Sequence, residues 1–225
     1  MINFKFKLLL ITTLICTYNF GFCQPKEIKI KFIGNCGLYF SDGNSNLYID
    51  FPYKSGAHNY MEYDKSEIAN IKKENSTFIF THKHADHYSK KLLNNMEGKK
   101  YGPWNISEIK EIENSIPYFK IDPLKTEHKV FGISFEHYSY LIVWHNKRIF
   151  ISGDTENSDT VAKINNINWL FAPAWLLIDA KEKKIKVDAE KIGLYHIGKK
   201  DNITTADSKI RLLNKSGDII IIPFD

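Results

Sequence analysis

The chain has 225 residues, of which 43% are hydrophobic and 25% are charged, a composition typical of a globular protein. This length suffices to bury the core of one domain and leaves little room for a second. The net charge of +5 is spread along the chain. Because we find no basic stripe with interleaved aromatic side chains, we expect no nucleic-acid partner.

The first two dozen residues have the pattern of a secretory signal peptide. Two early lysines precede a short apolar stretch over residues 8–16, and residues 21–23 read Gly-Phe-Cys. The apolar stretch is too short for a comfortable membrane span, and no later stretch is long enough. We predict cleavage after Cys23, which leaves a domain at residues 24–225 that is exported to the periplasm or secreted. Lipid attachment to Cys23 is the less favoured alternative, because Phe22 is a poor residue before a lipidated cysteine.

Cys36 would be the only cysteine of the cleaved chain, so we expect no internal disulfide. A domain of this size needs none, because its hydrophobic core can suffice. Cys36 lies among apolar and glycine residues, from Ile33 to Leu38. We therefore interpret it as a small buried side chain rather than a nucleophile.

Strands and a hairpin are predicted at the start of the cleaved chain. Residues 28–33 read Ile-Lys-Ile-Lys-Phe-Ile, the alternation of a strand with one buried face. Residues 38–40 and 47–51 flank an Asp-Gly turn, which indicates a hairpin. That turn has oxygen-bearing residues at alternate positions, as at the start of a calcium loop. Leu47 replaces the glycine that such a loop requires, so we interpret the segment as a hairpin only.

The remaining elements are predicted from hydrophobic periodicity and from capping and turn residues. Residues 77–80 form a short, wholly apolar strand, as expected in a sheet that is covered on both faces. Two sheets packed face to face with helices outside would accommodate the order of elements. The other predicted strands are 118–121, 124–127, 133–144, 148–152, 169–172, 192–195 and 218–222, and the predicted helices are 64–74, 88–96, 107–114, 155–164 and 205–213.

The residues with the clearest chemistry follow the apolar strand at 77–80. The segment His82-x-His84-x-Asp86-His87 places three histidines and one carboxylate within six positions. His82 and His84 are two residues apart at the end of a strand, so they can point the same way. Imidazole and carboxylate suit zinc, and to a lesser degree iron or manganese. We therefore predict a site for one or two Zn²⁺ ions, with Mn²⁺ or Fe²⁺ as alternatives.

This motif resembles the signature of the metallo-β-lactamase fold superfamily. Two later segments resemble that family as well, namely Ser-Gly-Asp-Thr at 152–155, like its aspartate motif, and Tyr-His-Ile-Gly at 195–198, like its last histidine. The resemblance covers nearly all of residues 26–225 in motif order and is closest to the small, single-domain members. It implies an α/β fold, the αβ/βα four-layer sandwich of two mixed β-sheets packed face to face with helices outside.

The resemblance also implies a set of metal ligands. The mid-chain ligand is open between two histidines: we favour His128, at the end of a predicted strand, over His137, inside the next strand. Asp86 and Asp154 would in addition orient the nucleophile. The implied ligands of the first ion are the histidines His82, His84 and His128, and those of the second are Asp86, His87 and His196. The carboxylate of Asp154 would bridge the two ions.

The resemblance implies a metal-dependent hydrolase that attacks a carbonyl or phosphoryl centre of a small molecule, such as an ester, lactone, thioester, amide or phosphodiester. A zinc ion lowers the pKa of bound water to about 7, which provides hydroxide at neutral pH. No strained Gly-x-Ser-x-Gly elbow competes with this interpretation. The alternative is a non-hydrolytic relative of the same fold that binds metal or uses it in redox chemistry. Loops at 53–63, 101–104 and 175–178 carry the aromatic residues that would select the substrate.

Export makes a direct prediction for the full-length chain expressed in a bacterial host. We expect the exported protein to begin at Gln24, as measured by intact mass and N-terminal sequencing. A mass increased by a diacylglycerol on Cys23 would instead indicate a lipoprotein. Full-length protein retained in the cytoplasm would contradict the signal-peptide interpretation.

Overall fold

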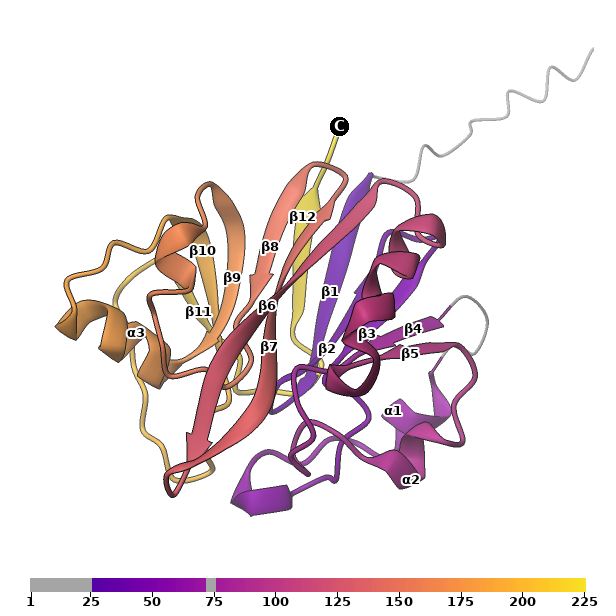
Figure 1. Cartoon of the computed structure of the whole chain (residues 1–225), viewed down its shortest axis with the longest axis horizontal. Helices are drawn as coiled ribbons and strands as arrows, with labels where there is room; N and C mark the ends of the chain where they lie inside the picture. Colours follow the sequence, from indigo (N-terminus) through magenta and orange to yellow (C-terminus); the bar gives the residue numbers. More distant parts are fainter. Residues whose placement is uncertain (1–25, 72–75) are drawn as a thin grey trace, which may run out of the picture.

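In the part of the chain that the structure describes, twelve strands in two six-stranded sheets form the centre of the domain (Figure 1). The computed structural model describes residues 26–71 and 76–225. The predicted signal peptide, residues 1–23, lies outside the described residues, as does the end of the helix predicted over 64–74. None of the helices in the described part of the chain is long and apolar enough to cross a bilayer.

The first sheet has the order β12-β1-β2-β3-β4-β5 and is mixed. Neighbouring strands pair antiparallel from β12 to β3, and β3, β4 and β5 are parallel. Its strands are β1 (Glu27–Gly34), β2 (Gly37–Ser41), β3 (Asn46–Ile49), β4 (Ser76–Ile79), β5 (Lys99–Tyr101) and β12 (Ile219–Pro223).

The second sheet has the order β11-β10-β9-β8-β7-β6 and is also mixed. The hairpins of β6, β7 and β8 are antiparallel, whereas β8 to β11 are parallel. Its strands are β6 (Phe119–Val130), β7 (Ile133–Trp144), β8 (Lys147–Ile151), β9 (Ile167–Pro173), β10 (Ala189–Tyr195) and β11 (Ile210–Leu212).

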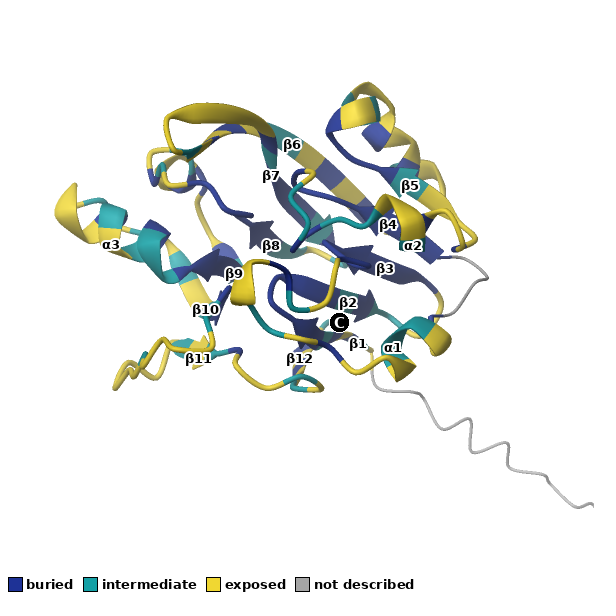
Figure 2. Cartoon of the chain, turned by 90° about the horizontal axis from the view of Figure 1, so that it is seen from below, coloured by how far each residue is buried: buried dark blue, intermediate teal, exposed yellow. Residues whose placement is uncertain are grey.

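The helical segments are short and lie outside the sheets or at their margins (Figure 1). Figure 2 shows buried strands at the centre of the molecule, surrounded by largely exposed loops and helices. The helices are α1 (Ser66–Ala69), α2 (Lys90–Leu93) and α3 (Ala174–Glu182), and the 3₁₀ segments are η1 (Ala57–Asn59), η2 (Pro103–Asn114) and η3 (Val161–Lys163).

Side chains alternate between the two faces of a strand, so the apolar side chains pack in three places: between the two sheets and on the outer side of each sheet. On β4 and the residue after it, Ile79 faces the core between the two sheets, while Phe78 and Phe80 face the side that α1 and α2 cover. On β9, Phe171 faces the central core and Leu170 packs with residues of α3 on the other side of the second sheet. The predicted fold, two mixed sheets face to face with helices outside, is confirmed.

Several predicted elements were wrong in type or extent. The two strands predicted at 118–121 and 124–127 are one strand, because β6 is an edge strand and tolerates Pro123, which has no N–H to donate. The helix predicted at 205–213 is an exposed loop followed by β11, which forms by parallel pairing with β10. The helix predicted at 155–164 shrinks to η3, and the loop predicted at 175–178 belongs to α3.

Candidate metal centre

The predicted ligands gather at the edge where strands of both sheets end. The segment that leaves β4 reaches across to the second sheet, because Tyr138 N donates to Thr81 O at 3.0 Å. The Tyr140 hydroxyl donates to Phe80 O at 2.8 Å in the same junction. These two bonds hold the His82 segment against β7. Predicted ligands follow three strands that end here: His82 after β4, Asp154 after β8 and His196 after β10.

Three imidazoles form the first group. One ligand nitrogen each from His82, His84 and His128 lies within 4.8 Å of the others, and His84 Nδ1 is 3.2 Å from His128 Nε2. Nitrogen atoms bound to one tetrahedral zinc ion lie about 3.3 Å apart, so this separation fits a shared ion. His82 Nε2 is buried and has no hydrogen-bond partner among the described residues. Burial lowers the pKa of His82 well below its usual value and also lowers that of His84, which favours the neutral imidazole that binds metal.

His137, the alternative mid-chain ligand, is engaged elsewhere. Its Nε2 accepts the backbone N–H of Asp154 at 2.9 Å, and its Nδ1 lies 2.6 Å from the Thr126 hydroxyl. Burial lowers the pKa of His137 to about 3, so the ring is neutral. A Cβ atom on Gly153 would lie 2.3 Å from His137 Nε2, which explains why glycine precedes Asp154. The geometry therefore favours His128 as the ligand and gives His137 the role of positioning Asp154.

Asp154 lies between the first group and a second group, which consists of Asp86, His87 and His196. Its Oδ1 is 3.1 Å from His87 Nε2, and its Oδ2 is 3.1 Å from His196 Nε2 and 3.8 Å from His82 Nε2. Asp86 Oδ2 is 3.2 Å from His196 Nε2. The Nε2 atoms of His87 and His196 are buried and make no hydrogen bond with proper geometry despite these short distances. Donor atoms that converge without bonding to one another fit a common metal ion.

The charges of the second group favour a bound cation. Asp50, Asp86 and Asp154 are all buried, and no lysine or arginine pairs with them among the ion pairs of the described residues. Burial alone would raise the pKa of Asp154, but His196 and His87 beside it hold the pKa well below its usual range. Burial alone would lower the pKa of His87, yet the Asp154 carboxylate raises it well above its usual value. A metal ion could supply the positive charge that this group attracts.

Cys36 is buried, as predicted, but it also contacts the candidate centre. Its Sγ lies 3.9 Å from Asp154 Oδ1 and is oriented to donate a hydrogen bond to it. Sγ also lies within 4.8 Å of ligand atoms of His87 and His196. Burial raises the pKa of the Cys36 thiol well above its usual value. We assign the thiol as a neighbour that helps to orient Asp154, a contact that the sequence pattern alone did not indicate.

Other residues that the sequence analysis missed orient the predicted ligands. The buried Asp50 carboxylate lies 2.9 Å from His87 Nδ1 and accepts hydrogen bonds from the backbone and hydroxyl of Thr81. Glu156 Oε1 lies 3.0 Å from His128 Nδ1. Such carboxylate–histidine contacts fix the ring orientation and leave the other ring nitrogen for the metal. The sequence feature that could have identified Asp50 is its position directly after the apolar strand β3, which pairs with β4.

An open cleft of about 570 Å³ lies over the two groups. His58, Tyr60 and Trp175 line it, together with the outer part of the β6–β7 hairpin. His58 Nε2 lies 3.9 Å from Asp86 Oδ1, and its side chain is largely exposed. His58, in the loop at 53–63, therefore borders the candidate centre. Trp104 instead packs against Phe80 and lies outside the cleft lining.

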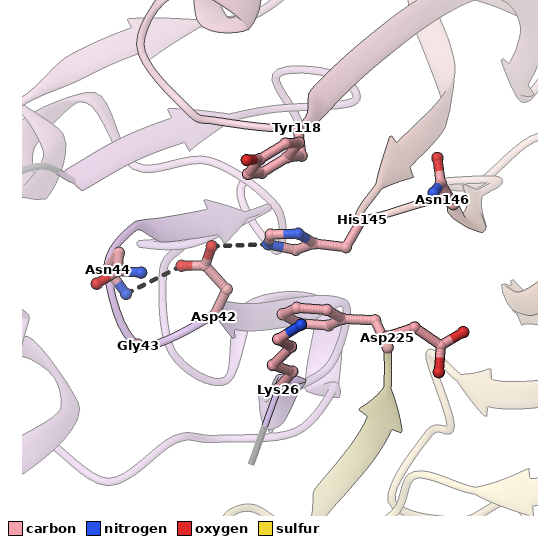
Figure 3. Close-up of a pocket in the computed structure, with 9 residues that line it drawn as sticks. Lys26, Asp42, Gly43, Asn44, Tyr118, His145, Asn146 and Asp225 are labelled. Atoms are coloured by element: carbon pink, nitrogen blue, oxygen red, sulfur yellow. Dashed lines mark hydrogen bonds and ion pairs between the residues drawn. The ribbon is translucent and has the colours of Figure 1, made fainter. Parts of the chain in front are cut away.

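His145 lies in the turn between β7 and β8, at the opposite end of these strands from the candidate centre. It lines a separate pocket of about 590 Å³, which Figure 3 shows. Its Nε2 is 2.9 Å from Asp42 Oδ2, which joins the β7–β8 turn to the β2–β3 turn. The ring also stacks on Phe224, with centroids 3.8 Å apart. His145 therefore ties the two sheets together at the end opposite to the metal-ligand cluster.

Comparison with known proteins supports the fold. No family model and no curated protein matches the chain. Igni18, a metallo hydrolase from the archaeon Ignicoccus hospitalis, is 13% identical with a TM-score of 0.62, over 88% of this chain and 100% of that chain. The metallo-β-lactamase fold protein YhfI from Bacillus subtilis is 16% identical with a TM-score of 0.61, over 87% of this chain and 99% of that chain. The chain therefore has the metallo-β-lactamase fold, as its motifs predicted.

The contact of Asp50 with His87 predicts a role for Asp50 in metal binding. We expect Asp50→Asn to lower the affinity for the second metal ion about 10- to 100-fold, because an amide cannot accept the three hydrogen bonds that the carboxylate accepts. The measurement is zinc competition with a chromophoric chelator. The matched control is Asp42→Asn, which alters the histidine contact at the opposite end and should leave zinc affinity within about twofold. Equal zinc affinity of wild type and Asp50→Asn would contradict this role.

Proposed function

We propose that this protein is a metal-dependent hydrolase with two metal ions, most simply Zn²⁺, in the candidate centre. The observation that carries the proposal is the position of Asp154 between two convergent groups of donor atoms. The proposed ligands are the seven residues implied by the sequence, with His128 as the mid-chain histidine: His82, His84 and His128 for one ion, Asp86, His87 and His196 for the other, and Asp154 for both.

The residues present fit a reaction with water at a carbonyl or phosphoryl centre. When bound, two zinc ions supply hydroxide at neutral pH and stabilise negative charge that develops on a substrate oxygen. Asp86 and Asp154 would accept hydrogen bonds from the attacking water and orient it. Substrate would enter through the cleft beside His58 and Tyr60, where the exposed His58 imidazole can contact its polar part. The signal-peptide pattern of residues 1–23 supports the further proposal that the reaction takes place outside the cytoplasm.

Metal analysis and a substrate screen test this proposal together. Purified protein freed of metal by chelation is reloaded with Zn²⁺, Mn²⁺ or Fe²⁺ and assayed on lactones, esters, thioesters, phosphodiesters and β-lactams. We expect two zinc ions per chain and hydrolysis of at least one class, lost on chelation and restored by zinc. Tight binding of iron with no hydrolysis would favour the non-hydrolytic alternative instead. Failure to bind any metal would contradict both.

His84→Ala tests whether the first group binds the metal. We expect this variant to lose about one metal ion per chain and at least 100-fold in kcat/KM, because it removes a proposed ligand at a partly buried position and leaves the fold intact. The measurements are elemental analysis and steady-state kinetics on the substrate found by the screen. His145→Ala, the same substitution at the far end of the sandwich, is the control and should keep both metal ions. Unchanged metal content in His84→Ala would contradict the proposed ligand set.

A further inference from the structure

The β6–β7 hairpin extends beyond the rest of the second sheet and has two chemically different faces (Figure 1). Side chains that pair across an antiparallel ladder share a face. On one face, Thr126 pairs with His137 and His128 pairs with Phe135, and Val130 with Ile133 continues that face to the tip. The face that carries the metal-ligand histidine is thus apolar at its outer end.

The other face of the hairpin is polar. Glu127 pairs with Glu136, and Lys129 pairs with Ser134. Contact with solvent accounts for the polar side chains of that face, because charged side chains at alternate positions of an edge hairpin are normally solvated. Water does not explain the apolar face, whose outer residues would also be expected to be polar if they met only solvent.

The outer end of the apolar face is uncovered. Ile133 is 63% exposed and Phe135 is 38% exposed, and the outer part of the hairpin is exposed in Figure 2. At the tip, Phe131 is 100% exposed and has φ 51°, followed by Gly132 with φ 79°. A two-residue turn with two positive φ angles favours Asn-Gly, and a bulky aromatic residue is unfavourable at its first position. Local backbone preference therefore does not account for Phe131 there.

This apolar surface is continuous with the cleft over the candidate metal centre. Val130 and Phe131 line the cleft, and Trp175 lines it from α3. The Phe135 ring lies 4.4 Å from the ring of His84, centroid to centroid. An apolar group that leaves the metal centre along the hairpin would therefore meet Phe135 first and then the tip.

The charges that line the cleft favour an uncharged substrate. Apart from the proposed ligands and His58, the charged residues among the described lining residues are Lys129 and Glu156. Lys129 Nζ pairs with Glu127 at 3.1 Å, and Glu156 contacts His128. A phosphodiester is an anion and would favour cations beside the metals, and Lys129 is the one lysine or arginine among the described lining residues. An acyl substrate needs an apolar surface, which the hairpin supplies.

We propose that the apolar hairpin face, defined as Val130, Phe131, Ile133 and Phe135, binds the aliphatic acyl chain of an ester or lactone whose carbonyl lies at the metal centre. This inference rests on the proposed hydrolase function. Water adds to the carbonyl carbon, the acyl C–O bond breaks, and a proton goes to the leaving oxygen. An ester therefore gives a carboxylic acid and an alcohol, and a lactone gives one hydroxy acid. No other reactant is needed.

Chain-length dependence of ester hydrolysis tests the proposal. The zinc-loaded protein is assayed with p-nitrophenyl acetate, butyrate and octanoate, and we expect kcat/KM to rise at least tenfold from acetate to octanoate. In the double variant Phe131→Ser/Ile133→Ser, we expect the octanoate-to-acetate ratio to fall about tenfold. The control is Ile221→Ser, an exposed isoleucine on β12 outside the cleft, which should keep the wild-type ratio.

A binding experiment separates this proposal from the proposed function. Octanohydroxamate and acetohydroxamate both present a metal-binding head and differ in the apolar chain. By calorimetry on the zinc-loaded protein, we expect the octanoyl compound to bind at least tenfold more tightly, and the double variant to lose that difference. Hydroxamate binding with this preference, but no hydrolysis of any substrate class in the screen, would contradict the proposed function and leave the apolar site supported.

Three results would overturn the proposal. The first is equal affinity for the two hydroxamates together with a flat chain-length profile. The second is a wild-type dimer that the double variant converts to a monomer, which would make the hairpin face a contact between copies of this chain. The third is co-sedimentation with phosphatidylglycerol vesicles that the double variant abolishes while both hydroxamates still bind equally, which would assign the face to a lipid surface.

Discussion

The arrangement of this protein depends on one buried carboxylate, that of Asp154. It lies between the imidazoles that follow β4 and the imidazole that follows β10, and these groups belong to different sheets. His137 holds the backbone of Asp154 in place, and only a glycine at 153 permits that approach. A buried carboxylate with no lysine or arginine partner is unfavourable by itself. The fold therefore brings Asp154 to a place where a cation would be strongly bound.

The β-sandwich explains how residues far apart in the chain reach that carboxylate. The strands β4, β8 and β10 end at the same edge, where the residues that follow them include candidate ligands. The hydrogen bonds from Tyr138 and Tyr140 to the segment after β4 join the two sheets at that edge. At the opposite end, His145, Asp42 and Phe224 join the two sheets and line a separate pocket of about 590 Å³, which none of the candidate metal ligands lines. The β6–β7 hairpin then adds an apolar surface at the mouth of the cleft, continuous with the candidate metal ligands.

The fold and most of the candidate ligands could be predicted from the sequence, because close spacing and strand ends carry their own signal. Helix lengths could not, since α1 and α2 are only four residues long and owe their form to packing on the first sheet. The edge strand β11 forms by pairing with β10, which periodicity over three residues cannot reveal. The choice between His128 and His137 needed the partners of both ring nitrogens, and the contacts of Asp50 and Cys36 needed the tertiary structure.

X-ray absorption at the zinc edge tests the central claim most directly. In protein loaded with two equivalents of zinc, the account predicts nitrogen and oxygen ligands about 2.0–2.1 Å from the metal. It also predicts a zinc–zinc scattering vector of about 3.5–4 Å, because Asp154 would bridge the two proposed ions. The Asp154→Ala variant should lose that vector. Absence of metal–metal scattering in the wild type, or a sulfur ligand from Cys36 in place of Asp154, would contradict the account.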